Sequence, residues 1–338
     1  MSTQEEIANP REEIANPLLS GFPRVDGWRF VGRYGAILVL IAMIVTFAIL
    51  EPHSFATRSN AINVLNQSSL TAIISMGLTF PLVAGEFDLS VGYQASFAGV
   101  MVTGLMQNSG LSIPVAIVMM LVMGAAIGLA NGLIVTKVGV NALVTTLGVG
   151  TVVVGLTYAY TGGLPVSLKK PQSFINLTFD KLFGIPYPVY IMVVVAVILW
   201  LLLNRTATGQ AMQAVGGNSE AARLSGIRVS RVVIATFVIA AVCAAITGIL
   251  LASFTGSAAV DGGNSYLLSA FAATFLGSAV LREGQFHILG TLIGVLTVSI
   301  GFNAMAILGL ETYYQYLFQG TLLILAVGVG TMARKRAL

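Results

Sequence analysis

The sequence predicts an all-α, polytopic membrane protein with about ten transmembrane helices. Apolar residues make up 56% of its 338 positions and charged residues only 9%, against about 25% charged residues in a typical soluble domain. Many apolar runs approach or reach the roughly 20 residues that a helix needs to cross a bilayer, for example 36–50, 113–135 and 189–203. Because lipid offers no partner to a free backbone group, these spans are expected to be helices.

The predicted elements begin with a polar tail. Residues 1–30 are rich in glutamate and lack the early apolar core of a cleavable signal peptide, so they are predicted to be a cytoplasmic N-terminal tail before an uncleaved first span. Residues 31–338 are predicted to form the transmembrane domain. Its ten spans are expected near 33–50, 61–84, 89–107, 113–135, 141–160, 188–204, 232–254, 266–281, 287–306 and 313–332.

Loop charge predicts how these ten spans are oriented. With the N-terminus in the cytoplasm, thirteen of the seventeen Lys and Arg residues fall in inner loops or tails. The four on the outside are Arg58, Lys169, Lys170 and Lys181. The positive-inside rule prefers this threading to its inverse, so both termini are predicted to be cytoplasmic.

Two rows of glycine predict close helix packing. Gly124, Gly128 and Gly132 lie four residues apart, and Gly290 and Gly294 repeat that spacing. Residues four apart share one face of a helix, and without side chains they allow a second helix to approach closely. We therefore expect both rows to be packing faces.

The segment after the sixth predicted span, near 205–231, is the longest and most basic of the inner loops. Asn218 suits the start of a helix, Glu220 its first turn and Gly226 its end. The short amphipathic helix between them has Ala221, Ala222 and Leu224 as its apolar contacts. From the residues alone, it is either a docking surface for a soluble partner or a helical connector.

Four motifs occur in a fixed order along the chain. They are Asp-Leu-Ser-Val-Gly at 88–92, a pair of stretches within 131–148, Gly-Gly-Asn with Ala-Ala and Ser-Gly-Ile within 216–227, and a pair of stretches within 272–291. Together they resemble the ribose-type, binding-protein-dependent ABC sugar permeases. The resemblance covers roughly residues 35–330. The chain departs from the family pattern at 141–143 and 281–286, which leaves pentoses, hexoses, furanoses and nucleoside-like solutes all open as substrates.

The resemblance implies a permease subunit of an ABC importer in the bacterial inner membrane, which translocates a monosaccharide and performs no covalent chemistry. It implies three partners: an ABC ATPase subunit, a periplasmic sugar-binding protein, and a second permease, either an identical copy or a related chain. The chain has no Gly-x4-Gly-Lys-Ser/Thr phosphate loop. No cofactor is therefore expected on this chain, and ATP and Mg²⁺ are expected on the ATPase. The implied coupling residues are Gly209, Gly216, Gly217, Asn218, Glu220, Ala221, Ala222, Ser225 and Gly226.

Polar side chains within or beside the spans are candidates for a translocation pathway, because amides and hydroxyls suit the hydrogen bonds of a sugar. The alternative role is hydrogen bonding between helices, and Asp88 could also cap the helix that follows it. The sequence gives no candidate metal site and no catalytic residues. The pathway candidates are Asn66, Gln67, Asp88, Gln94, Asn131, Asn141 and Asn303.

Two other classes of function stay open. An ion-coupled secondary transporter usually needs ionisable groups inside its spans, and here Glu86 and Asp88 are nearly the only ones. A membrane-embedded enzyme would need a cluster of nucleophiles, acids or metal ligands. The sequence therefore favours the importer subunit over both.

Overall fold

The structure is a computed structural model that describes residues 27–169, 172–280 and 284–337. Most of the predicted N-terminal tail, residues 1–26, lies outside this range. Each of the ten predicted spans coincides with a long helix. These helices are α1 (Gly27–Leu50), α2 (Arg58–Val83), α3 (Val91–Ser109), α4 (Ile113–Leu133), α5 (Ala142–Thr161), α7 (Tyr187–Arg205), α10 (Val229–Thr255), α11 (Asn264–Ser278), α12 (Ile288–Ile307) and α13 (Thr312–Ala337).

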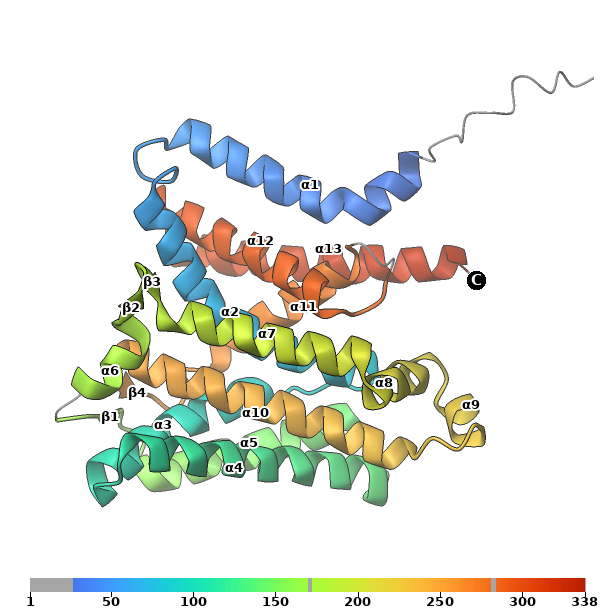
Figure 1. Ribbon diagram of the computed structural model, residues 1–338, viewed down its shortest axis with the longest axis horizontal. Helices are drawn as coiled ribbons and strands as arrows, with labels where there is room; N and C mark the ends of the chain where they lie inside the picture. The colour runs from blue at the N-terminus through green and yellow to red at the C-terminus, as the bar shows by residue number, and fades with distance from the viewer. Residues whose placement is uncertain (1–26, 170–171, 281–283, 338) are drawn as a thin grey trace, which may run out of the picture.

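The two ends of the bundle differ (Figure 1). At one end, α6 (Gln172–Phe179) lies beside two small antiparallel pairs of strands, in which Val166 is opposite Ala258 and Lys181 is opposite Pro186. These strands are β1 (Val166–Ser167), β2 (Lys181–Leu182), β3 (Ile185–Pro186) and β4 (Ser257–Ala258). At the other end lie α8 (Ala207–Gly217), α9 (Ser219–Leu224) and the C-terminus. We call these the strand end and the α8–α9 end.

The helices support a polytopic membrane protein. Within the described residues, five helical segments are long and apolar enough to cross a membrane by length and composition: 113–138, 142–161, 187–205, 229–255 and 288–307. The first of them is α4 continued by the π-helical turn η2 (Ile134–Val138). A shorter apolar helix covers Tyr34–Leu50. The predicted number of ten crossings stays a prediction.

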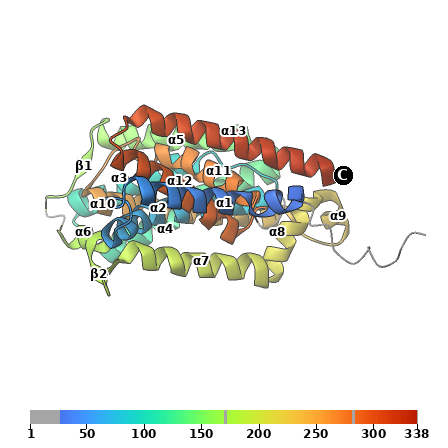
Figure 2. The same cartoon turned by 90° about the horizontal axis from the view of Figure 1, so that it is seen from above.

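Helix packing follows one pattern twice. The long helix α10 packs on α3 and α4, while the long helix α2 packs on α11 and α12. Helices α2 and α10 also pack on each other at the centre, and α5 and α13 lie against α3 and α11 respectively. Helices α7 and α13 lie on opposite sides of the bundle (Figure 2). The centre of the molecule is therefore an α2–α10 pair with a similar group of helices on each side.

The glycine rows pack as predicted. A Cβ atom added to Gly128 of α4 would lie 2.6 Å from the carbonyl oxygen of Phe237 in α10. One added to Gly294 of α12 would lie 1.9 Å from the carbonyl oxygen of Ala273 in α11. Any larger side chain at either position would separate two helix backbones. The prediction that these rows are packing faces is confirmed.

Helix ends follow local sequence signals. Thr57 precedes α2, and its side-chain oxygen accepts a hydrogen bond from the backbone N–H of Asn60 at 3.1 Å. Asn141 does the same for α5, where it accepts from the N–H of Leu143 at 2.9 Å. Such side chains satisfy backbone donors that the first turn of a helix leaves free. Asn141 is exposed, so its role in the structure is that of a cap.

Candidate functional site

The loop predicted near 205–231 folds into two short helices with a capping residue before each. Thr206 accepts a hydrogen bond from the N–H of Gly209 at 3.1 Å and starts α8. Asn218 ends α8, with its own N–H bonded to the carbonyl of Ala214 at 3.0 Å. The Asn218 side chain then accepts from the N–H of Ala221 at 2.9 Å and starts α9. The predicted helix start at Asn218 is confirmed.

Gly226 ends this helical segment, as predicted. Its φ of 85° lies in the left-handed region that favours glycine. The N–H of Gly226 reaches the carbonyl of Arg223 at 3.0 Å, and the N–H of Ile227 reaches that of Ala222 at 3.0 Å. Helix α9 is thus fixed at both ends, and it presents a stable shape although it lies at the rim of the molecule.

The predicted coupling residues divide into a packed group and an exposed group. Gly209 and Ala222 are buried. A Cβ atom at Gly216 would lie only 1.7 Å from the carbonyl oxygen of Val83 at the end of α2. Gly217 has no atom within 4 Å of the same added position. Gly216 is also solvent-exposed but is counted with the packed group because of its contact with Val83, and the exposed group comprises Gly217, Asn218, Glu220, Ala221, Ser225 and Gly226.

The exposed group surrounds an apolar side chain that sequence reasoning placed among the contacts of α9. Leu224 is 78% exposed at the end of that helix. Beside it, Glu220 and Arg223 form an ion pair, in which Arg223 Nε donates to Glu220 Oε2 at 3.1 Å. The hydrogen bond from Arg223, together with its positive charge, lowers the pKa of Glu220. We call Gly217, Asn218, Glu220, Ala221, Leu224, Ser225 and Gly226 the α9 surface.

The predicted pathway residues fall into separate places. Asn66 and Gln67 of α2 and Asn303 of α12 line one cavity of about 390 Å³. Asp88, Gln94 and Asn131 belong to a second, sealed group. Asn141 belongs to neither, because it caps α5 at the surface.

The cavity lies between α2, α10, α11, α12 and α13, near the strand end of the bundle. On one wall, Asn60 and Asn303 exchange two hydrogen bonds between α2 and α12, at 2.9 and 2.8 Å. On another, Gln319 of α13 is 6% exposed, and its Nε2 donates to the hydroxyl of Ser269 in α11 at 2.9 Å. We call this space the polar cavity.

Sequence reasoning missed the α11 and α13 side of the polar cavity. Gln315 and Gln319 both line it from α13, four residues apart, and that spacing places two side chains on one helix face. This signal was present in the sequence. Ser269 and Tyr266 of α11 gave no comparable signal, since their position depends on how α11 packs.

The sealed group centres on the hydroxyl of Ser90. Gln94 Nε2 and Asn131 Nδ2 both donate to Ser90 Oγ, at 2.7 and 2.9 Å, while Ser90 Oγ donates to Asp88 Oδ1. The backbone N–H of Ser90 also donates to that carboxylate oxygen at 2.9 Å. All four side chains are at most 1% exposed. We call Asp88, Ser90, Gln94 and Asn131 the sealed cluster.

No group of three or more His, Cys, Asp and Glu residues with metal-binding geometry occurs among the described residues. His287 instead starts α12. Its Nδ1 accepts the N–H of Gly290 at 2.9 Å, and its Nε2 lies 2.8 Å from the carbonyl of Val280, to which this tautomer donates.

Comparison with known proteins identifies the family. Residues 60–327 match the family described as "Branched-chain amino acid transport system / permease component". The ribose import permease of Bacillus subtilis is 37% identical over 296 residues, covering 87% of this chain and 91% of the relative. That of Escherichia coli K12 is 35% identical over 295 residues, covering 86% and 90%. The chain belongs to this permease family.

A third relative is the L-arabinose ABC transporter permease of Azospirillum brasilense, 33% identical over 300 residues, covering 89% of this permease and 88% of the relative. No solved structure matches. The permease is thus a multi-pass inner-membrane subunit of a bacterial ABC importer, and the ion-coupled alternative is set aside. Its relatives are permease subunits and not ATPases, which agrees with a transport role without chemistry of its own.

Proposed function

We propose that this permease imports a monosaccharide, and that pentoses are its first candidate substrates. One observation supports this above the rest: relatives named for ribose and L-arabinose are 33–37% identical to it over 86–89% of its length. A D-allose permease is 31% identical over 306 residues, so a hexose belongs in the same substrate panel.

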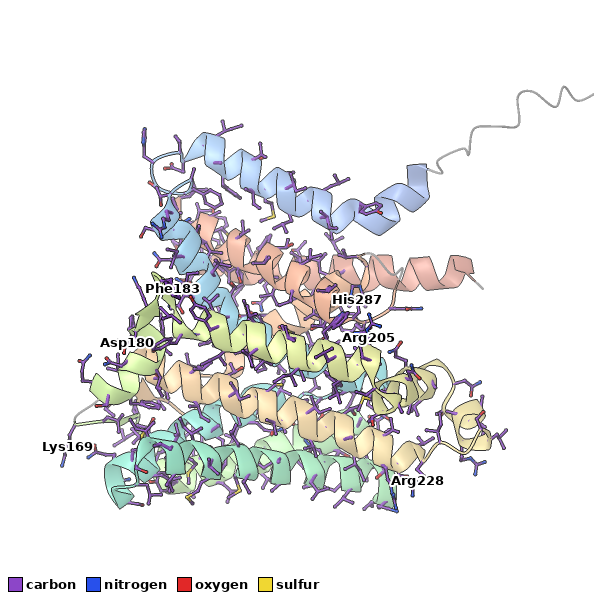
Figure 3. The ribbon with its side chains drawn as sticks, viewed as in Figure 1. Lys169, Asp180, Phe183, Arg205, Arg228 and His287 are labelled. Carbon is purple, nitrogen blue, oxygen red and sulfur yellow. The ribbon has the colours of Figure 1, made fainter. Side chains whose placement is uncertain are left out.

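We propose that all ten long helices cross the membrane and that the α8–α9 end faces the cytoplasm. Arg205 and Arg228 lie toward that end, while Lys169 lies at the strand end (Figure 3). The excess of basic residues in the inner loops favours this orientation. The strand end then faces the periplasm, and the C-terminus and predicted N-terminal tail are cytoplasmic.

The α9 surface suits the docking of an ATPase subunit. It combines an exposed apolar side chain, Leu224, with an open backbone at Gly217 and exposed polar groups around them. Caps at Asn218 and Gly226 hold this shape in advance, which lowers the entropic cost of binding. ATP and Mg²⁺ would be bound by that ATPase subunit. A sugar-binding protein would dock at the strand end. A second permease, either an identical copy or a related chain, would complete the membrane-spanning part of the transporter.

Transport by reconstituted complexes tests the proposal that the permease imports a monosaccharide. Complexes with the ATPase and binding protein, purified together from the native host, are placed in liposomes, and uptake of radiolabelled D-ribose, L-arabinose and D-allose is measured. We expect ATP-dependent uptake of at least one sugar. Uptake of none of them, from complexes whose binding protein is present and folded, would reject the monosaccharide assignment.

Docking is tested by Gly217→Glu and Ala221→Glu, which add a bulky charged side chain to the α9 surface. Neither replaces a packed side chain, so the permease should still reach the membrane while the ATPase no longer co-purifies and uptake is lost. Gly217→Ala is the matched control, because a methyl group meets no atom within 4 Å, and it should retain uptake. Normal uptake in both glutamate variants would reject the docking surface.

A further inference from the structure

We propose that the polar cavity is the site where the permease itself contacts the sugar, and that Gln319 and Gln67 determine which sugars pass. This inference rests on the proposed function and adds to it a defined site. The cavity lies near the strand end (Figure 1), where α2, α11 and α13 each contribute polar side chains to its lining. Under the proposed orientation, the cavity lies toward the periplasmic side of the bundle.

The described lining is uncharged and combines polar with apolar side chains. Its described side chains include the amides of Asn66, Gln67, Asn303, Gln315 and Gln319, with serine and threonine hydroxyls between them, and no Asp, Glu, Lys or Arg. Amides and hydroxyls both donate and accept hydrogen bonds, as the hydroxyls of a sugar do. An amino acid, the solute in the family description, carries two charges, which this lining does not pair.

The cavity also has the size and the apolar surface of a small-molecule site. Its volume of about 390 Å³ falls within the range of ligand pockets, about 300–1,000 Å³. Phe254, Tyr266, Phe302 and Tyr316 lie among the polar groups. Aromatic walls with a few placed polar groups are the usual composition of such pockets, and the rings provide flat apolar faces for the C–H side of a sugar.

The amides in the lining differ in how they are held, and one of them has an unpaired oxygen. Asn66 Oδ1 is buried without a hydrogen-bond partner among the described residues. Gln319 is held in place, since its Nε2 donates to Ser269, whose hydroxyl donates in turn to the carbonyl of Ser265 at 3.1 Å. A buried amide fixed by such a chain is pre-organised for recognition, whereas Gln67 is exposed at the cavity and adaptable.

Substrate protection provides a direct test. The permease has one cysteine, Cys243, which is buried and is therefore expected to be unreactive. In Gln67→Cys, the new thiol would be the accessible one, and its rate of modification by a charged methanethiosulfonate is measured on the purified complex. We expect the wild-type sugar to slow modification several-fold, and leucine at the same concentration to leave it unchanged.

Selectivity provides the second test. Gln319→Leu and Gln67→Leu each remove one amide, so uptake of the preferred sugar should fall about three- to tenfold, the effect of a lost hydrogen bond. The ratio of ribose to arabinose uptake should change as well, and ATPase stimulation by loaded binding protein should persist. Gln107→Leu makes the same change at the strand end outside this cavity, and should leave the ratio unchanged.

The outcomes separate the two proposals. If the wild-type complex imports none of the sugars, the proposed function fails. If it imports sugar, but Gln67→Leu keeps the wild-type rate and ratio and Gln67→Cys is not protected, the cavity assignment fails. Should Gln319→Leu not reach the membrane, the exposed position Gln67 still decides the question.

Discussion

The polar cavity and the sealed cluster contain the same kinds of side chain, yet one set lines an open space and the other is almost completely buried. In the sealed cluster, Ser90 Oγ accepts two hydrogen bonds and donates one, while Asp88 Oδ2, Gln94 Oε1 and Asn131 Oδ1 are buried without a partner among the described residues. In the polar cavity, the amides meet open space and Asn66 keeps an unpaired oxygen. Three residues of the motif 88–92 region and its neighbours are thus closed off from solvent, while less conspicuous amides line the cavity that we propose for the sugar.

The largest loss of stability is expected from Ser90→Val in the sealed cluster. Loss of the hydroxyl leaves the buried donors of Gln94 and Asn131 without their shared acceptor, while Asp88 Oδ1 keeps the backbone N–H of Ser90. Each orphaned group costs about 1–3 kcal/mol, so we expect roughly 3 kcal/mol of lost stability and a clear fall in the apparent melting temperature in detergent. A melting temperature equal to that of the wild type would show that the cluster is not structural.

A smaller effect is expected from Asp88→Asn. The substituted side chain keeps the oxygen that accepts from Ser90 and loses only its negative charge, so stability should fall by about 1 kcal/mol or less. Uptake should fall less than in Gly217→Glu, measured in the same liposomes. A well-folded Asp88→Asn variant with no uptake at all would move Asp88 from the structural group to the pathway.

Asn303→Leu tests the pair of hydrogen bonds between Asn60 and Asn303 at the wall of the polar cavity. It removes both hydrogen bonds to Asn60, which retains its bond to the carbonyl of Phe55 at 3.0 Å. Because hydrogen bonds between membrane helices average about 0.6 kcal/mol, the melting temperature should fall only slightly, while uptake falls more. Asn60→Leu is the partner variant, and the pair analysed as a double-mutant cycle isolates the interaction.

The smallest change in stability is expected from a substitution of Thr145 in α5. Its hydroxyl is buried and has no hydrogen-bond partner among the described residues. Thr145→Val replaces it with a methyl group of similar size, so no bond is lost and stability should be unchanged or slightly higher. Its neighbour Thr146 accepts the N–H of Leu89 at 3.1 Å, and Thr146→Val should lower the melting temperature, which makes it the matched comparison.

The positions of the helices could be predicted from the sequence because membrane spans are local features. Apolar runs, the cap at Asn218 and the glycine rows all have local sequence signals, and the structure confirms them, whereas Asn141, a pathway candidate by sequence, caps α5. Which polar residues line the cavity and which are buried in the cluster could not be predicted in this way. Asn66 and Asn131 look alike in sequence, and only the packing of α2, α4 and α13 places one beside a cavity and the other against Ser90.

The coupling residues show the same limit. Gly216 and Gly217 are neighbours of identical type, and nothing in the local sequence distinguishes them. Packing does so, because α8 approaches the carbonyl of Val83 on one side of the loop and leaves the other side open. A close approach between distant segments depends on the whole fold, so it has no local signature.

The contact between Gly216 and Val83 makes α2 a mechanical link through the molecule. This single helix of 26 residues is about 39 Å long. One end abuts the loop on which the ATPase would pull, and the first half of the same helix carries Asn66 and Gln67 into the polar cavity. A tilt imposed near Val83 would be passed along α2, through the turn that contains Pro81, to the cavity wall.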